Sequence, residues 1–135
     1  PLAYGLIHNT PTFGLPGNPV SCQIGFLQFV RPWIRLALGD PNPYLPVVKA
    51  IMQGRYRKKA GRAELCRVNL KWDGQCWLAS LTGAQGSGSQ TSMVVANGLM
   101  LLSEDTCAVE DGELVDVQVI RDPLLPNEAP KYPWS

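Results

Sequence analysis

The sequence predicts a mainly β fold, in which a small β-barrel or sandwich follows a unit of strand, loop and helix. Between residues 19 and 38, apolar residues recur every three or four positions, as on one face of a helix. From residue 65 onward they alternate with polar residues, as in half-buried strands. Short segments of this second kind are separated by glycine-containing turns, which is typical of antiparallel barrels and sandwiches.

The helix is expected to begin at Pro19, because Asn18 is a favoured N-cap and proline suits the first helical position. Its apolar positions are Val20, Ile24, Leu27, Val30, Ile34 and Leu38. We expect Gly39 to end the helix in a left-handed conformation and Pro32 to kink it. Upstream, Thr12-Phe13-Gly14-Leu15 predicts a short buried strand.

The loop Gly14–Ser21 joins this strand to the helix and is the first candidate binding site. The N–H groups of Val20, Ser21 and Cys22 are expected to point out of the helix start, where the helix dipole favours an anion. A purely structural turn is the alternative, because most such connections bind nothing. The loop lacks the Gly-Lys-Ser/Thr of a Walker A motif and the Gly-x-Gly-x-x-Gly dinucleotide fingerprint.

Three prolines in residues 40–46 predict a stiff linker and a domain boundary. The predicted division is residues 1–39, the end of a larger α/β domain; residues 40–122, the β domain; and residues 123–135, a proline-rich tail over the surface or partly disordered. Residues 1–39 lack the partners that cover a sheet face, and the initiator methionine is missing, so we expect a C-terminal fragment. Such a fragment should dimerise, swap or aggregate through its apolar surface.

The clearest strand is the alternation of Cys66, Val68, Leu70 and Trp72 with the residues between them. Asp73-Gly74 then predicts a two-residue type I′ turn and a hairpin with residues 76–81, in which Lys71 faces Cys76. Further strands are expected over residues 47–52, 99–102 and 114–120.

Composition and cysteine usage exclude several classes of function. The 12 Lys and Arg residues against 11 Asp and Glu give a net charge of +1, which supplies no general attraction for nucleic acid or an acidic membrane. No apolar run is long enough to span a membrane, so a cytoplasmic protein is the default expectation. The four cysteines form no Cys-x-x-Cys pair and are predicted to be free thiols, and with one histidine, His8, no zinc set is expected. We expect His8 to lie on the surface rather than to act in catalysis.

The β domain holds three further candidates. Thr82–Ser92 is rich in glycine and polar side chains, which suits either an oxyanion cradle or a flexible connection. Five basic residues within Arg55–Arg62 form either a solvated face or a phosphate- or RNA-binding patch. Arg67 is predicted on the face opposite the core, where its guanidinium either aims at an anion across a cleft or is an ordinary exposed arginine.

Four segments together resemble the C-terminal third of molybdopterin molybdenumtransferase, the MoeA and gephyrin E-domain family. They are Pro1-Leu2-Ala3-Tyr4-Gly5, Thr12-Phe13-Gly14-Leu15-Pro16-Gly17-Asn18-Pro19-Val20-Ser21, Thr82-Gly83-Ala84-Gln85-Gly86-Ser87, and Ser92-Met93 with Ala96-Asn97-Gly98-Leu99. The resemblance covers nearly all of residues 1–120.

The resemblance implies that residues 1–39 close the α/β molybdopterin-binding domain and that the following residues form a small β-barrel, domain IV. It implies a homodimeric enzyme that uses Mg²⁺ to insert molybdate into adenylylated molybdopterin, which yields molybdenum cofactor and AMP. The alternative is a non-catalytic interaction module of the gephyrin type.

By position, the resemblance assigns molybdate or substrate binding to Gly17, Asn18, Ser21, Arg67 and Ser87. Pro1 matches the last residue of the family's Pro-Gly-Lys-Pro segment. The catalytic lysine and the Mg²⁺ ligands are therefore expected upstream of Pro1, and the chain alone is expected to be inactive.

Overall fold

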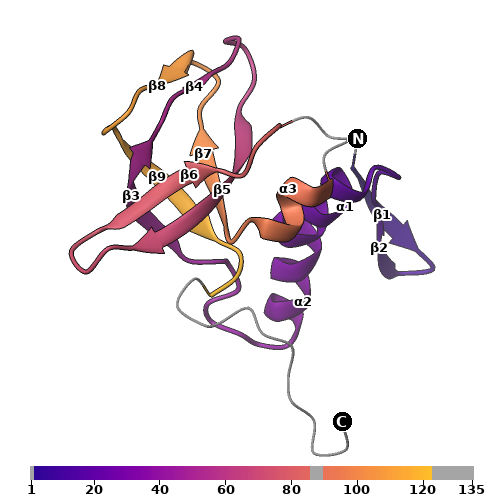
Figure 1. The fold of residues 1–135 in the computed structure, drawn as a ribbon. Coiled ribbons are helices and arrows are strands. Elements are labelled where there is room, and N and C mark those ends of the chain that lie inside the picture. The colour runs from indigo at the N-terminus through magenta and orange to yellow at the C-terminus, as the bar shows by residue number, and fades with distance from the viewer. Residues whose placement is uncertain (1, 86–89, 123–135) are drawn as a thin grey trace, which may run out of the picture.

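Five strands form a closed β-barrel in the computed structural model, which describes residues 2–85 and 90–122 (Figure 1). The barrel strands are β3 (Val47–Gln53), β5 (Glu64–Trp72), β6 (Trp77–Leu81), β7 (Gly98–Leu102) and β9 (Leu114–Val119). Their order around the barrel is β3-β6-β5-β7-β9. The mainly β fold is thus confirmed, and of the two predicted architectures the structure is the barrel.

One pair of barrel strands departs from the antiparallel pattern. β3 runs parallel to β6, whereas the other neighbouring pairs are antiparallel. The short strands β4 (Tyr56–Arg57) and β8 (Ala108–Val109) pair with each other as a separate two-stranded sheet.

Alternate side chains of the barrel strands point inward and form the core. On β5 these are Cys66, Val68 and Leu70, each at most 2% exposed. Gly98 lets β7 approach the opposite side chains closely, because a Cβ there would lie 2.6 Å from Val117 Cγ1. The inward residues predicted on β5 are therefore confirmed as core.

The β5–β6 hairpin has a different register from the predicted one. Lys71 faces Leu78 rather than Cys76, and Trp72 faces Trp77. The loop is therefore four residues long, and its geometry is set by Asp73, whose Oδ1 accepts hydrogen bonds from the backbone N–H groups of Gln75 and Cys76, both at 2.8 Å. The Asp73 carboxylate therefore stabilises a four-residue loop in place of the two-residue turn that an Asp-Gly pair favours.

The N-terminal unit consists of a β-hairpin and one long, irregular helix. β1 (Ala3–Ile7) pairs antiparallel with β2 (Thr10–Gly14), and the exposed His8 lies in the turn between them. The helix has three parts, α1 (Pro19–Gly25), the π-helical η1 (Phe26–Val30) and α2 (Arg31–Ala37). The π turn comes directly before Pro32, which has no N–H to continue an α-helical ladder. Gly39 follows the helix with φ of 80°, the predicted left-handed stop.

A further helix, α3 (Gln90–Val95), occupies the end of the segment expected to be a loop. It contacts α1 and β5 and lies between the long helix and the barrel (Figure 1). A side-chain bond also joins the two units directly, because Gln28 of η1 donates to Gln118 of β9. Within the second unit, Arg121 donates to the carbonyl oxygen of Val94 and holds α3 to the end of β9. In Figure 1 the β1–β2 hairpin lies on the side of the helix away from the barrel.

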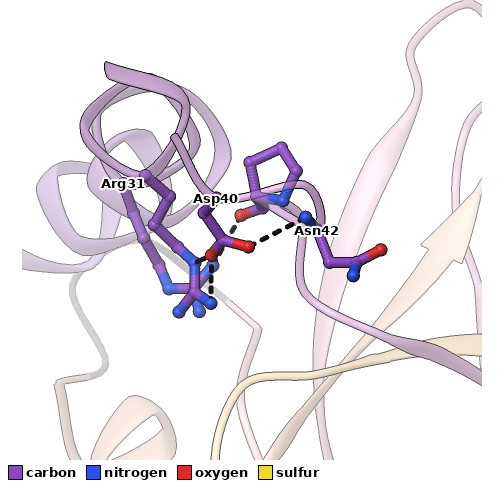
Figure 2. A network of polar contacts seen from close by, with 5 residues as sticks. Arg31, Asp40 and Asn42 are labelled. Atoms are coloured by element: carbon purple, nitrogen blue, oxygen red, sulfur yellow. Dashed lines mark hydrogen bonds and ion pairs between the residues drawn. The ribbon is translucent and has the colours of Figure 1, made fainter. Parts of the chain in front are cut away.

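The linker after the helix is held against α2 by a polar network (Figure 2). Asp40 pairs with Arg35 and accepts a hydrogen bond from the backbone N–H of Asn42 at 2.8 Å. Arg31 donates to the carbonyl oxygen of Pro43 at 2.9 Å. The predicted stiffness of this segment thus has a second source beyond proline. The predicted division at residues 39 and 40 stays a prediction, and the tail 123–135 lies outside the described residues.

In the part of the chain that the structure describes, no helix is long and apolar enough to cross a membrane.

Candidate functional site

The helix start is organised by Asn18. Its Oδ1 accepts hydrogen bonds from the N–H groups of Val20 and Ser21 at 3.1 and 3.2 Å, and its carbonyl oxygen accepts one from Cys22 at 2.8 Å. The prediction that these three N–H groups are available to an anion is therefore wrong, because the favoured N-cap that starts the helix also satisfies them. What the loop offers a ligand is the exposed Gly17 backbone, with open space beside its Cα, and the half-buried Ser21.

Arg67 lies on the outer face of β5, as predicted, but it is only 3% exposed. Its Nε donates to Ser92 Oγ at 2.6 Å and its Nη2 donates to the carbonyl oxygen of Ala84 at 3.0 Å. The ordinary exposed arginine is therefore wrong, whereas the role of the guanidinium in binding an anion stays a prediction. The segment after β6 and helix α3 fold over the side chain, so Arg67 fixes the position of both.

Gln85 extends the sheet at the point where β6 leaves β5. Its Oε1 accepts from the Arg67 N–H at 2.8 Å and its Nε2 donates to the Arg67 carbonyl oxygen at 3.0 Å, so the amide replaces a strand neighbour. On the other side of β5, Asn97 makes the same pair of bonds to Leu70, at 2.6 and 3.0 Å. These two amides hold the segments on either side of α3 to one strand.

A cleft of about 580 Å³ separates the helix from the barrel. Ile24 of α1 lines one side, and Gln85 with residues of β4 and β5 lines the other. Ser21 is three residues before Ile24, so the two are neighbours on the helix surface. Helix α1, which follows the Gly14–Ser21 loop, and Gln85 of the Thr82–Gln85 segment thus lie at the same cleft. The loop itself lies at a neighbouring cavity of about 460 Å³, which Leu15 and Cys22 line.

Three polar side chains of the cleft wall form a cluster. Tyr56 donates from its hydroxyl to Glu64 Oε2 at 2.8 Å, and the Cys66 thiol lies 3.9 Å from the same oxygen. Burial, followed by the hydrogen bond to Glu64, raises the pKa of Tyr56 well above its usual range. Burial also raises the pKa of Cys66 to about 11. Both groups therefore keep their protons at neutral pH and act as donors to the carboxylate.

The remaining predicted residues are placed as follows. Ser87 lies outside the described residues, so its role stays a prediction. The basic cluster is largely exposed, and within it Arg57 pairs with Glu110 while Lys58 donates to the carbonyl oxygen of Arg62. All four cysteines are free thiols, as predicted.

In residues 2–85 and 90–122, no three His, Cys, Asp or Glu side chains come together as a metal site. Sequence reasoning included Gln85 and Ser92 only as members of the Thr82–Ser92 candidate, and it missed Tyr56 and Glu64 as parts of the site. Gln85 and Ser92 stand in the motifs that carry the resemblance, which is the signal that pointed to them. Nothing local distinguishes Tyr56 and Glu64.

Comparison with known proteins agrees with the predicted resemblance. The chain is 33% identical over 117 residues to molybdopterin molybdenumtransferase 2 of Mycobacterium tuberculosis, which covers 87% of the chain and 28% of that protein. It is 31% identical over 123 residues to the Bacillus subtilis molybdopterin molybdenumtransferase, covering 91% and 28%. Gephyrin of Dictyostelium discoideum is 33% identical over 119 residues, covering 82% of the chain and 17% of that protein.

A solved structure, that of a molybdopterin biosynthesis MoeA protein from Pyrococcus horikoshii, superposes with a TM-score of 0.74 at 30% identity. It covers 90% of this chain and 29% of that one. The chain thus spans little more than a quarter of the length of these transferases. Residues 49–120, which include all but the start of the barrel, match the family model of the MoeA C-terminal region, domain IV. The chain therefore belongs to the family of the MoeA C-terminal region (domain IV).

Proposed function

We propose that this chain is the C-terminal part of a molybdopterin molybdenumtransferase, an enzyme that inserts molybdate into adenylylated molybdopterin and releases AMP and molybdenum cofactor. The observation that carries the proposal is the cleft between helix and barrel. Ile24, beside Ser21, lines one wall and Gln85, which bonds to Arg67, lines the other. The helix that begins in the first motif and Gln85 of the second thus meet at one concave site, in a chain whose relatives include named transferases.

The chemistry of these groups suits a tetrahedral oxyanion. Gly17 lets the backbone approach a ligand closely, and the Ser21 hydroxyl can donate to an oxyanion. Arg67 supplies positive charge beside the Ala84 carbonyl oxygen. We assign these residues to binding and orienting molybdate, and the ligands of Mg²⁺ to the part of the protein upstream of this chain.

The proposal is tested with a chimera. The matched C-terminal segment of the Bacillus subtilis enzyme is replaced by this chain, and AMP release from adenylylated molybdopterin is measured with molybdate and Mg²⁺. We expect the chimera to release AMP, the isolated chain to release none, and Ser21→Ala to raise the molybdate concentration needed for half-maximal rate. Ser103→Ala, on an exposed turn, is the matched control. A chimera that folds but is as inactive as the truncated enzyme would refute the proposal.

Homodimerisation of the complete protein and its cytoplasmic location belong to the same proposal. Sedimentation and fractionation of the complete protein would check them.

A further inference from the structure

In the cleft wall formed by β4 and β5, the carboxylate of Glu64 can accept further hydrogen bonds. Gln85 uses both ends of its amide on Arg67, and the Tyr56 hydroxyl is donated to Glu64 Oε2. Across residues 2–85 and 90–122, the hydrogen bonds to Glu64 both go to Oε2. Oε2 is thus held in place by one short bond, from Tyr56, and a carboxylate has about four acceptor positions, so each of its two oxygens can still accept one hydrogen bond from a ligand.

The surroundings of Glu64 restrict the kind of ligand. Ile24 and Leu65 give the cleft apolar walls, which suit the faces of a flat ring. Four exposed basic residues lie on the segment just before Glu64, namely Arg55, Arg57, Lys59 and Arg62. Because their charge disfavours a second cation nearby, a neutral ring with N–H donors fits better than an amine. Any negative part of the ligand would be favoured beside these residues.

We propose that Glu64 binds a planar heterocycle through two adjacent donors, a ring N–H and an exocyclic amino group. This donor pair is found on pterins and on guanine, and it is absent from adenine, which presents an acceptor next to its amino group. A carboxylate matches such a pair with two parallel hydrogen bonds. The inference rests on the proposed function, and it assigns the pterin end of the substrate, rather than the adenylate, to this cleft.

Tyr56 has a positioning role in this arrangement. Its hydroxyl fixes Glu64 Oε2 at 2.8 Å, and burial keeps the phenol protonated, so the carboxylate is oriented before the ligand arrives. A fixed acceptor binds more tightly than a mobile one, because less side-chain freedom is lost on binding.

The test titrates the 135-residue chain with 6-hydroxymethylpterin, guanosine and adenosine, using pterin fluorescence and saturation-transfer NMR. We expect the pterin to bind and adenosine not to bind. Glu64→Gln should weaken pterin binding by about tenfold, because a charge-assisted pair of bonds is lost, and Tyr56→Phe should weaken it less. Asp105→Asn, an exposed charge change on the turn after β7, should have no effect.

Equal binding of adenosine and pterin, or no pterin binding to the wild-type chain, would overturn the assignment. So would unchanged affinity in Glu64→Gln. If Glu64→Gln fails to fold, as judged by its thermal transition, Tyr56→Phe and the comparison of the three ligands decide the question. Tighter binding of guanosine than pterin would make the site a guanine site and would overturn the link to the substrate. Because this assay contains no molybdate, its failure is separate from failure of the chimera to release AMP.

Discussion

Arg67 is a buried guanidinium that attaches the segment after β6 to the outer face of the barrel. The sequence predicts its face correctly, since alternation along β5 puts it opposite Cys66 and Val68. Its burial was not predictable, because the groups that cover it, Ser92 and the Ala84 carbonyl, come from a glycine-rich segment with no periodic pattern. A partner 25 positions away is invisible to local reasoning.

We expect Arg67→Lys to destabilise the chain by about 1–3 kcal/mol. A lysine ammonium cannot make both of the bonds that Arg67 makes from Nε and Nη2, so one of the two acceptors would lose its partner. Urea unfolding followed by tryptophan fluorescence measures this. Arg55→Lys, the same change on an exposed residue, should alter the free energy of unfolding by less than about 0.5 kcal/mol. Equal effects of the two substitutions would show that the contacts of Arg67 contribute nothing to stability.

The roles of Ser21 and Ser87 in binding molybdate stay predictions. Sequence reasoning identified the loop of Ser21 but assumed that the helix-start N–H groups are available, although Asn18 accepts two of them. The error is physical, since an N-cap both marks a helix start and satisfies the donors there.

At the scale of the element, β5 depends on two amide side chains where its neighbouring strands end. β7 begins at Gly98, and just before it the side chain of Asn97 takes the place of a neighbouring strand. Its Oδ1 accepts from the N–H of Leu70 on β5, and its Nδ2 donates to the Leu70 carbonyl oxygen. Asn97→Asp keeps the acceptor but places a carboxylate oxygen against the Leu70 carbonyl. We expect a loss of about 2 kcal/mol in the free energy of unfolding.

Thermal and urea unfolding at pH 7 measure this loss, with Asn69→Asp on the exposed face of the same strand as the control. An Asn97→Asp variant as stable as the control would mean that backbone pairing alone holds the strand.

The linker after α2 gives a prediction about pH. The backbone N–H of Asn42 and the Arg35 guanidinium lower the pKa of Asp40 below its usual value of 3.8. A carboxyl with a lowered folded-state pKa stabilises the fold above its unfolded-state pKa, and that stability is lost as the pH falls through the folded-state value. The wild-type advantage over Asp40→Asn should therefore be present at pH 6 and shrink as the pH drops below about 4.

Urea titrations at pH 6 and pH 3 compare the two proteins. If the difference in the free energy of unfolding between the two proteins is the same at both pH values, the charged form of Asp40 is not the source of the stabilisation.

The elements show which parts of a sequence predict structure. Strands β3, β5, β7 and β9 follow the predicted ranges closely, because period-two alternation and glycine turns are local signals. The hairpin register failed because the Asp73 side chain, rather than the Asp-Gly pair, shapes the loop. Helix α3 was missed because glycines just before it hide its start. The parallel β3–β6 pair was missed because strand order depends on tertiary packing, which local patterns do not contain.

At the scale of the whole molecule, the N-terminal unit exposes large apolar side chains that the barrel does not cover. On the long helix they are Phe26, Phe29, Trp33, Ile34, Leu36 and Leu38, and on β1 they are Tyr4, Leu6 and Ile7. We expect the isolated chain to self-associate through this surface. Sedimentation velocity should show the weight-average mass rising with concentration.

A double substitution, Phe29→Lys with Leu36→Lys, should shift this chain toward the monomer, because both residues are more than half exposed and carry no core packing. Val94→Lys, equally exposed on α3, is the control and should leave the association unchanged. A wild-type chain that stays monomeric at high concentration would contradict the prediction.

The position of β3 in the barrel has a consequence for how the chain is made. β3 is the first barrel strand to leave the ribosome, yet it pairs with β6 in the middle of the sequence and with β9 near its end, as in Val48 with Val117. It therefore has no barrel neighbour until β6 has been made, and the barrel cannot close until β9 is free. Closure of so long a loop is slow, so this domain is expected to fold as one unit after β9 has left the ribosome rather than strand by strand.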